Sequence, residues 1–223
     1  MVLPDDYLDD LMVCMAHHST AIEGNSLTQG ETKSVLVDAY IPRAMNVREL
    51  NEVLNYKRFM PVLLEMLKEH SPVDVMFVRR IHGILCGNAI EGVPGAFKTV
   101  QNMIVGADFT PTPPYLVPMQ LHDWASNLET QMICAVTDAE RIEAICRQHI
   151  AFERIHPFSD GNGRTGRALM VYSCLRAELP PIVVPVEQKP AYISCLNTED
   201  LPAFAAFANR LIEEERARMR LFS

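Results

Sequence analysis

The segment from His156 to Arg167 constrains the fold most, because it must interrupt a helical chain at a fixed point. Pro157 disfavours helical geometry at the residue before it, so the preceding helix has to end near His156. Gly161 and Gly163 permit backbone conformations that other residues avoid, and successive N–H groups can then converge into a nest that binds an anion. A helix that starts directly afterwards adds its N-terminal amides and its dipole. The segment therefore predicts a phosphate-binding turn between two helices.

The charged side chains of this turn favour an anionic ligand. Arg164 and Arg167 are three residues apart and share a face of the first helical turn, where cations oppose the helix dipole. Asp160 is a hard oxygen ligand that suits Mg²⁺ held jointly with phosphates. His156, the only histidine that we expect near this nest, can accept a proton from an attacking hydroxyl. A plain turn with solvated arginines is the alternative, but it does not explain why these residue types coincide.

Apolar residues at helical spacing predict an all-α chain elsewhere. We expect helices over 7–23, 28–39, 46–70, 72–85, 119–130, 138–155, 164–178 and 201–221. Thr28 followed by Glu31 predicts a capping box, whereas Pro61 predicts a kink or a break. Residues 87–118 are rich in Gly and Pro and contain two β-prone runs, 96–100 and 102–105. These runs predict a small β-hairpin or irregular flap that leans on the helices.

Composition narrows the classes of partner. The chain has 20 Lys and Arg against 28 Asp and Glu, a net charge of −8, which disfavours nucleic acids and anionic membranes but leaves room for one local cationic site. Its six cysteines form no C-x-x-C pair and lie among apolar neighbours, so we expect reduced core thiols and a cytoplasmic setting. The N-terminus lacks a basic signal region, and no apolar run approaches the roughly 18 residues that span a bilayer. The pair His17 and His18 has no third ligand at zinc-like spacing, and Trp124 on an apolar-periodic helix is predicted to lie in the core.

The twelve residues HPFSDGNGRTGR, 156–167, resemble the Fic signature H-P-F-x-[D/E]-G-N-G-R-x-x-R at every defined position. This resemblance implies a mostly helical Fic-type fold, binding of Mg²⁺ and ATP, and transfer of AMP to a hydroxyl side chain of a target protein. It implies that His156 is the general base, that Asp160 is the Mg²⁺ ligand and that Phe158 packs beneath the loop. It assigns contacts with the phosphates of ATP to Gly161, Asn162, Gly163, Arg164 and Arg167, with Arg167 at the γ-phosphate.

A second motif, STAIEGN at residues 19–25, contains a carboxylate that a neighbouring cation would stabilise. Glu23 near a helix C-terminus and Arg167 near a helix N-terminus are both disfavoured by the helix dipole, and an Arg–carboxylate pair would offset this. The stretch resembles the Fic inhibitory motif [S/T]-x-x-x-E-[G/N]-N, which ends at Asn25 here, and its N-terminal position is typical of the second class of the family. The resemblance implies that Glu23 occupies Arg167 and displaces the γ-phosphate, while Ser19 braces the helix. An ordinary helix C-terminus is the structural alternative.

Two further regions resemble parts of the family outside its signature. Residues 95–106 resemble the flap that registers a target segment by strand-like pairing, so Lys98, Met103 and Ile104 are candidate target-binding residues. Many relatives have Arg at the position of Lys98, and packing on the core is an equal alternative for Met103 and Ile104. Tyr192 and Asn197 resemble residues on the adenosine side of the site, although Tyr192 can also pack on its own helix.

The sequence therefore predicts that residues 1–223 form one Fic domain, with residues 7–25 as its inhibitory helix. The predicted activity is that of an autoinhibited, Mg²⁺-dependent protein adenylyltransferase that acts on a Tyr, Thr or Ser hydroxyl. One alternative is a hydrolase that removes AMP, with Glu23 orienting water. Another is a nucleotide-sensing or protein-binding module with vestigial catalysis, against which the retention of His156 and Asp160 argues. Family members often form homodimers, and no sequence feature decides for or against one here.

Overall fold

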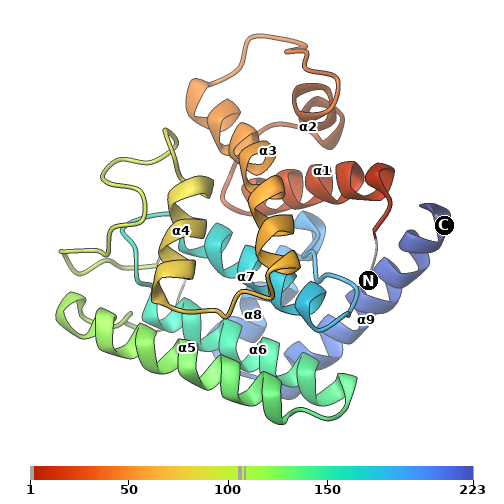
Figure 1. Ribbon diagram of the computed structural model, residues 1–223. Coiled ribbons are helices and arrows are strands. Elements are labelled where there is room, and N and C mark those ends of the chain that lie inside the picture. Colours follow the sequence, from red (N-terminus) through yellow and green to blue (C-terminus); the bar gives the residue numbers. More distant parts are fainter. Residues whose placement is uncertain (1–2, 105–106, 108, 223) are drawn as a thin grey trace.

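The computed structural model describes residues 3–104, 107 and 109–222, and helices dominate this part of the chain (Figure 1). They are α1 (Asp5–Ile22), α2 (Gln29–Leu36), α3 (Val47–Lys68), α4 (Val75–Leu85), α5 (Val117–Cys134), α6 (Asp138–Ile155), α7 (Asn162–Arg176), α8 (Lys189–Thr198) and α9 (Leu201–Met219). Short 3₁₀ turns are η1 (Pro114–Leu116), η2 (Val186–Gln188) and η3 (Arg220–Phe222). The prediction of an all-α fold is confirmed for the described residues.

Helix α7 lies in the middle of the molecule, with α1, α3, α4 and α6 packed around it (Figure 1). Almost every residue of α7 is buried, including Arg164 and Arg167. One apolar cluster lies between α7 and the helices α1, α3, α4 and α5, and a second joins α6 and α7 to α8 and α9. The turn that begins at His156 therefore opens into the N-terminus of the most enclosed helix of the fold.

Local sequence signals explain most of the helix boundaries. The capping box of Thr28 and Glu31 is present at the start of α2. Asp74 caps α4 through a hydrogen bond from the Phe77 N–H, so this helix starts three residues later than expected. Pro61 lies inside α3 without ending it, because its ring is on the exposed face while the neighbouring apolar side chains anchor the opposite face in the core.

Helix α8, on which Tyr192 lies, is outside the helical ranges that the apolar spacing predicts. It has only ten residues, too few for a clear apolar period, and Pro190 lies in its first turn, where proline is well tolerated. Tyr192, Cys195 and Leu196 are its buried residues. The helix matters because it forms one wall of the site described below.

The expected β-hairpin between residues 96 and 105 is absent from the described part of the flap. The physical reason is that the flap bonds to the loop of the motif instead of pairing with itself. The Lys98 N–H donates to the Pro157 carbonyl at 2.9 Å, and the Asn102 side-chain amide donates to the Phe158 carbonyl at 3.0 Å. Val105 and Gly106, the expected end of the hairpin, lie outside the described residues.

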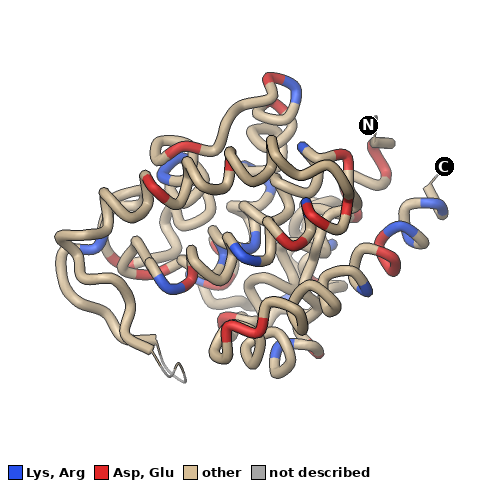
Figure 2. Tube along the Cα trace, turned by 90° about the horizontal axis from the view of Figure 1, so that it is seen from below, with Lys and Arg blue, Asp and Glu red and all other residues tan. Residues whose placement is uncertain are grey.

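The described helices carry charges of both signs, in keeping with a composition that disfavours nucleic acids and anionic membranes as partners. Acidic and basic positions alternate over the helices, and Figure 2 shows no element covered by cations alone. None of the helices in the described ranges is both long and apolar enough to cross a bilayer.

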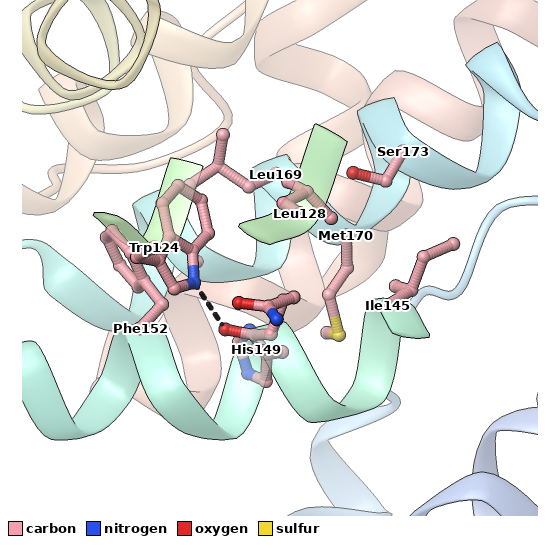
Figure 3. A pocket seen from close by; sticks show the side chains of 10 residues that line it. Trp124, Leu128, Ile145, His149, Phe152, Leu169, Met170 and Ser173 are labelled. Carbon is pink, nitrogen blue, oxygen red and sulfur yellow. Dashed lines mark hydrogen bonds between the residues drawn. The ribbon is translucent and has the colours of Figure 1, made fainter. Parts of the chain in front are cut away.

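Trp124 lies in the core as predicted, and its indole N–H donates to the Gln148 carbonyl at 2.7 Å between α5 and α6 (Figure 3). All six cysteines are free thiols, and only Cys134 is exposed.

Candidate active site

Helix α6 ends at His156, which adopts the left-handed conformation with φ 49° and ψ 61°. This conformation is uncommon outside glycine, and histidine tolerates it better than most residues. It lets the His156 N–H close the last turn on the Phe152 carbonyl at 2.9 Å while the chain reverses into Pro157. The helix end that the sequence predicts at this position is confirmed.

The turn after His156 is held rigidly from inside. The Asn162 side chain accepts from the Phe158 N–H and donates to the Phe158 carbonyl, both at 2.8 Å, so it closes the loop rather than facing solvent. Phe158 is fully buried and stacks on His82 with ring centroids 3.7 Å apart. Packing of Phe158 beneath the loop is therefore confirmed.

Two glycines make room for close neighbours at this turn. Gly161 has φ +76°, and a Cβ there would lie 2.2 Å from the Cys86 sulfur. A Cβ at Gly163 would lie 2.3 Å from a carboxylate oxygen of Glu23. Both positions therefore require glycine in this arrangement, the first for its backbone as well as for its packing. The free N-terminal amides of α7 begin at this point, and their partial positive charge favours an anion.

Ser19 and Glu23 of α1 meet Arg167 of α7. The Arg167 Nη2 donates to Glu23 Oε1 at 2.6 Å and to the Ser19 carbonyl at 3.0 Å, while Arg167 Nε donates to the Ser19 hydroxyl at 2.9 Å. Burial alone would lower the pKa of Arg167, but the Glu23 carboxylate holds it above its ordinary value. Burial alone would likewise raise the pKa of Glu23, and Arg167 brings it below the ordinary range. The pair is thus ionised on both sides.

Asn25, the last residue of the second motif, ties α1 to α3. Its amide donates to Glu52 Oε2 at 2.9 Å and to the Glu49 carbonyl at 3.0 Å, and its oxygen accepts from the Leu27 N–H at 3.0 Å. These bonds fix the chain just after Glu23. The role of Asn25 in this structure is to hold the end of α1 in place.

Arg164 is 1% exposed and lies beneath the turn, not on the side that faces the cavity described below. Its guanidinium is 3.5 Å from Glu52 Oε1 and 3.6 Å from Asp160 Oδ1. Burial opposes its charge, but Cys86, Glu52 and Asp160 raise its pKa above the ordinary value. The two motif arginines therefore diverge, because Arg167 turns toward α1 and Arg164 toward α3.

Asp160 is the candidate metal ligand, and its side chain is 44% exposed. Its Oδ1 accepts from the Gly161 N–H at 2.6 Å, and its Oδ2 pairs with Arg48 Nη2 at 3.1 Å. The described residues contain no group of three or more acidic, histidine or cysteine side chains that could enclose a metal by themselves. A single accessible carboxylate beside a phosphate-binding turn nevertheless fits Mg²⁺, which commonly takes one or two carboxylates together with substrate phosphates.

A cavity of about 190 Å³ brings seven of the fifteen predicted site residues together. Its walls come from the end of α1, the flap, the end of α6, the start of α7 and α8. The residues that line it are Ile22, Glu23, Ile104, Ala107, Phe109, Glu153, His156, Gly163, Arg167, Lys189, Tyr192, Ile193, Leu196 and Asn197. The predicted base, the predicted inhibitory carboxylate and the predicted adenosine-side residues thus share one cavity.

His156 lies in this cavity with a depressed basicity. Burial, and then the positive charge of Lys98, lower the pKa of His156 to about 4. Its Nδ1 faces the backbone carbonyl of Glu153 at 3.3 Å, which leaves Nε2 as the nitrogen available to a ligand. The imidazole is therefore neutral at physiological pH and free to accept a proton at Nε2.

The flap residues occupy three different environments. Ile104 lines the cavity, whereas Met103 is 89% exposed and points away from the core. Lys98 is buried, and its ammonium donates to Asn102 Oδ1 at 2.8 Å and to the Ile155 carbonyl at 3.4 Å. Burial lowers the pKa of Lys98 to about 8. Lys98 thus holds the flap against the end of α6.

On the opposite wall, Tyr192 is buried and its hydroxyl lies 2.7 Å from His149 Nε2. Asn197 lines the cavity at the far end of α8, and its carbonyl accepts from Arg154 at 3.5 Å. Lys189 donates to the Ile22 carbonyl at 2.6 Å, so α8 also holds the C-terminus of α1.

The expectation that His156 is the only histidine near the turn is wrong. His82 of α4 accepts from the Gly95 N–H at Nδ1, at 2.7 Å, and its Nε2 contacts the Asp160 carbonyl at 2.9 Å. Because Nδ1 accepts, the proton is on Nε2 and donates to Asp160. His82 is distant in sequence and lies on an ordinary amphipathic helix, so no local pattern marks it.

Comparison with known proteins places these features in a family. Residues 72–174 match the Fic/DOC family. The protein adenylyltransferase fic-1 of Caenorhabditis elegans is 32% identical to this chain over 209 residues, which cover 92% of the chain and 40% of that protein. The protein adenylyltransferase Fic of Drosophila willistoni is 30% identical over 198 residues, which cover 86% of the chain and 38% of that protein. The chain thus spans about 40% of the length of the curated relatives it matches.

Solved structures share the fold. A C. elegans Fic-1 structure superposes with a TM-score of 0.75 at 28% identity and covers 98% of this chain and 62% of that one. A Fic domain containing signaling protein from Bacteroides thetaiotaomicron superposes with a TM-score of 0.82 at 22% identity, covering 98% and 91% of the two chains. The helical arrangement, the HPFSDGNGRTGR turn and these matches agree, and the chain contains a Fic/DOC family domain and belongs to that family.

Proposed function

We propose that this chain is an autoinhibited protein adenylyltransferase, which transfers AMP from ATP to a Tyr, Thr or Ser hydroxyl of a target protein. The observation that carries the proposal is the cavity shared by His156, Gly163, Arg167 and Glu23. The names of the relatives, protein adenylyltransferases, support the same activity. We also propose that residues 1–223 act as one Fic domain with residues 7–25 as its inhibitory helix, which the contacts between α1 and α7 support.

The phosphates of ATP would bind over the start of α7. The amides of Gly161 and Gly163 and the helix dipole supply positive potential there, and Asn162 keeps the loop in this conformation. Arg167 would contact the γ-phosphate once its present partner leaves. Arg164, buried beneath the turn, would act on the phosphates through its charge. Tyr192 and Asn197 at the α8 wall would border the adenosine.

His156 would carry the proton transfer. Its Nε2 takes the proton of the target hydroxyl while that oxygen attacks the α-phosphorus, and the bond to pyrophosphate breaks. The new bond joins AMP to the target side chain. Ile104 and the exposed Met103 would border the target segment, and Lys98 would hold the flap in position.

Asp160 would hold Mg²⁺ together with the phosphates of ATP. When bound, the ion neutralises part of the phosphate charge that builds up as pyrophosphate departs. The carboxylate is accessible, and the exposed guanidinium of Arg48 is the neighbour that would have to yield to the ion.

Inhibition would follow from the pair of Glu23 and Arg167. While Glu23 Oε1 holds Arg167 Nη2 at 2.6 Å and Ser19 holds Nε, these two nitrogens of the guanidinium are not available to the γ-phosphate. The Glu23 carboxylate also lies within van der Waals distance of Gly163, where the phosphate chain would pass. ATP could then bind only with its phosphates displaced from the productive line.

Glu23 also favours a second candidate function, the removal of AMP from a modified protein. Its carboxylate is 41% exposed and lines the same cavity as His156, so it can orient a water molecule beside the bound AMP. The two activities would share one site: in transfer the target hydroxyl displaces pyrophosphate from ATP, and in hydrolysis water displaces the target hydroxyl from AMP. We also propose a cytoplasmic setting, which the free thiols of all six cysteines support.

The experiment that tests the proposal follows AMP by mass. The wild-type chain and the variants Glu23→Gly and His156→Ala are incubated with ATP and Mg²⁺, and intact mass spectrometry detects an AMP adduct. We expect an adduct on Glu23→Gly, little on wild type and none on His156→Ala. Loss of AMP from a pre-modified protein would support hydrolysis instead. ATP binding by all three proteins without either reaction would overturn both activities in favour of a nucleotide-sensing module.

A further inference from the structure

Glu153 is an acidic side chain of the site that the motifs do not include. It lies on α6 one turn before His156, is 7% exposed and lines the same cavity. Its Oε2 is 3.9 Å from Nδ1 of His156, and its Oε1 is 3.9 Å from Nε2 of His149. Among the described residues, Oε1 has no hydrogen-bond partner although it is buried. A buried, incompletely satisfied carboxyl is costly and calls for a functional explanation.

The neighbouring helix leaves space for this carboxyl. A Cβ at Gly166 would lie 2.5 Å from Glu153 Oε1 and 2.9 Å from a carbon of the His149 ring. Figure 3 shows His149 and Phe152 of α6 across a small pocket from Leu169 and Met170 of α7, and Gly166 of α7 also lines this pocket. Gly166 thus permits α6 and α7 to pack closely while a charged group stays between them.

The Glu153 side chain lies near Nδ1 of His156, whereas Nε2 is the nitrogen that would accept the proton of the target hydroxyl. The carbonyl and the carboxylate of Glu153 both lie near Nδ1, at 3.3 and 3.9 Å, so a proton on Nδ1 has acceptors and Nε2 remains free. When Nε2 accepts a proton, the imidazole becomes a cation in a buried place that already contains Lys98. A carboxylate on the Nδ1 side offsets that charge, as the aspartate does in the Ser-His-Asp arrangement.

The titratable side chains around Glu153 come from four helices. Arg167 of α7 and Glu23 of α1 face it, Tyr192 of α8 lies beyond His149, and His149 and His156 flank it on α6. Burial raises the pKa of Glu153 to about 7, with Arg167 lowering it and Glu23 raising it. Burial, and then Arg167, lower the pKa of His149 to about 3, so His149 stays neutral and does not cancel the charge of Glu153.

We propose that Glu153 is a positioning residue for His156, which keeps the proton of the free imidazole on Nδ1 and stabilises the imidazolium that forms when Nε2 accepts a proton. This inference rests on the proposed function, because it assumes that His156 is the base. Glu153 itself does not contact the target, the nucleotide or the reacting phosphorus. Its effect is expected on the maximal rate and its pH dependence, and not on the binding of ATP.

The first test does not require AMP transfer. Nitrogen NMR of His156 is recorded in the wild-type chain, in Glu153→Gln and in Glu143→Gln, whose carboxyl is exposed on the same helix and pairs with Arg147. At about pH 8, where Glu153 is ionised, we expect the Nδ1–H form in wild type and a smaller share of it in Glu153→Gln, with no change in Glu143→Gln. An unchanged tautomer in Glu153→Gln at that pH would overturn the inference.

The second test measures the maximal rate of automodification and the half-saturating ATP concentration in the Glu23→Gly background. Adding Glu153→Gln should lower the maximal rate about tenfold or more, leave half-saturation by ATP unchanged, and remove a rise in rate with pH that lies at or below about 7. Glu153→Asp should restore part of the rate. A full rate in Glu153→Gln contradicts the inference. If the background itself transfers no AMP, the proposed function fails, and the NMR result alone decides the role of Glu153.

Discussion

Glu23 Oε1 lies 2.6 Å from Arg167 Nη2, although the two residues are 144 positions apart in the chain. The contact joins the end of α1 to the first turns of α7, and each residue stands at the helix end where its own charge is disfavoured. Together they offset both costs. The same contact pairs the guanidinium of Arg167 with a carboxylate inside the cavity that both residues line.

Replacing Glu23 by Gly should therefore release Arg167 and raise automodification with ATP. A hydrogen bond to a charged group contributes about 1.5–3 kcal/mol, which corresponds to an increase of about tenfold or more. Incorporation of α-labelled phosphate from ATP measures it. Glu69→Gly is the matched control, because Glu69 is also the C-terminal cap of a helix but lies on α3, outside the cavity. Equal labelling of wild type and Glu23→Gly would falsify the inhibitory role.

Replacing Ser19 by Ala should weaken the inhibition in part. The Ser19 hydroxyl accepts from Arg167 Nε at 2.9 Å, whereas the Ser19 carbonyl and Glu23 still hold Nη2 in the variant. Automodification is expected to rise by less than in Glu23→Gly. A rise as large as that of Glu23→Gly would show that the hydroxyl, rather than the carboxylate, keeps Arg167 in place.

Arg48 should compete with a divalent cation for Asp160. Its Nη2 is 3.1 Å from Asp160 Oδ2, and both side chains are exposed enough that the pair contributes at most about 1 kcal/mol. Arg48→Ala should therefore tighten Mg²⁺ or Mn²⁺ binding in the presence of a non-hydrolysable ATP analogue by up to about fivefold. Calorimetric titration measures the affinity, and Arg80→Ala, which breaks an exposed pair with Glu65, is the control. Weaker cation binding in Arg48→Ala would contradict this reading.

Gly166→Ala should destabilise the fold. Its Cβ would lie 2.5 Å from Glu153 Oε1 and 2.9 Å from the His149 ring, so the packing of α6 against α7 has to shift, at a cost of about 1–3 kcal/mol. Gly30→Ala on α2 is the control, because its Cβ meets nothing within 4 Å and alanine favours the helix by about 0.5–1 kcal/mol. Urea unfolding of the two variants should show changes of opposite sign. No loss of stability in Gly166→Ala would mean that α6 and α7 can separate freely at this point.

The parts of the fold that local sequence predicts are those set by residues close together in the chain. Pro157 ends α6 and Thr28 caps α2, each through neighbours within a few residues. The flap shows the opposite case. Its β-prone runs predict a hairpin, but the Lys98 N–H and the Asn102 amide bond to a loop about 55 to 60 residues further along the chain. A local propensity cannot anticipate a partner at that distance.

The candidate site divides in the same way. The HPFSDGNGRTGR turn is continuous in sequence, so its residues could be recognised together. His82 lies on a helix with an ordinary amphipathic pattern, and only the packing of α4 against the turn brings it to Asp160. Glu153 is three residues before His156 on α6, so helical spacing alone places it beside His156, but its residue type matches no part of the motif. Gly166 could have pointed to a close contact here, because a glycine inside a buried helix often marks a side chain that packs against its backbone. The sequence does not say that this side chain is Glu153.

The pKa of Glu153 makes stability depend on pH in a definite direction. Burial raises this pKa to about 7 in the folded chain, against about 4.3 in an unfolded one. The folded state therefore holds the proton over this window, and unfolding releases it. The stability that goes with neutral Glu153 is fully present below about pH 4.3 and is lost as the pH rises through about 7.

Glu153→Gln cannot titrate and resembles the neutral form, so the comparison isolates this effect. The free energy of unfolding of wild type minus that of Glu153→Gln should fall by about 3–4 kcal/mol between pH 4.3 and 8. Urea unfolding at several pH values measures both proteins, with Glu143→Gln, exposed on the same helix, as the control. A difference that stays constant across this range would mean that Glu153 is ionised in the folded chain throughout, in which case Arg167 outweighs burial.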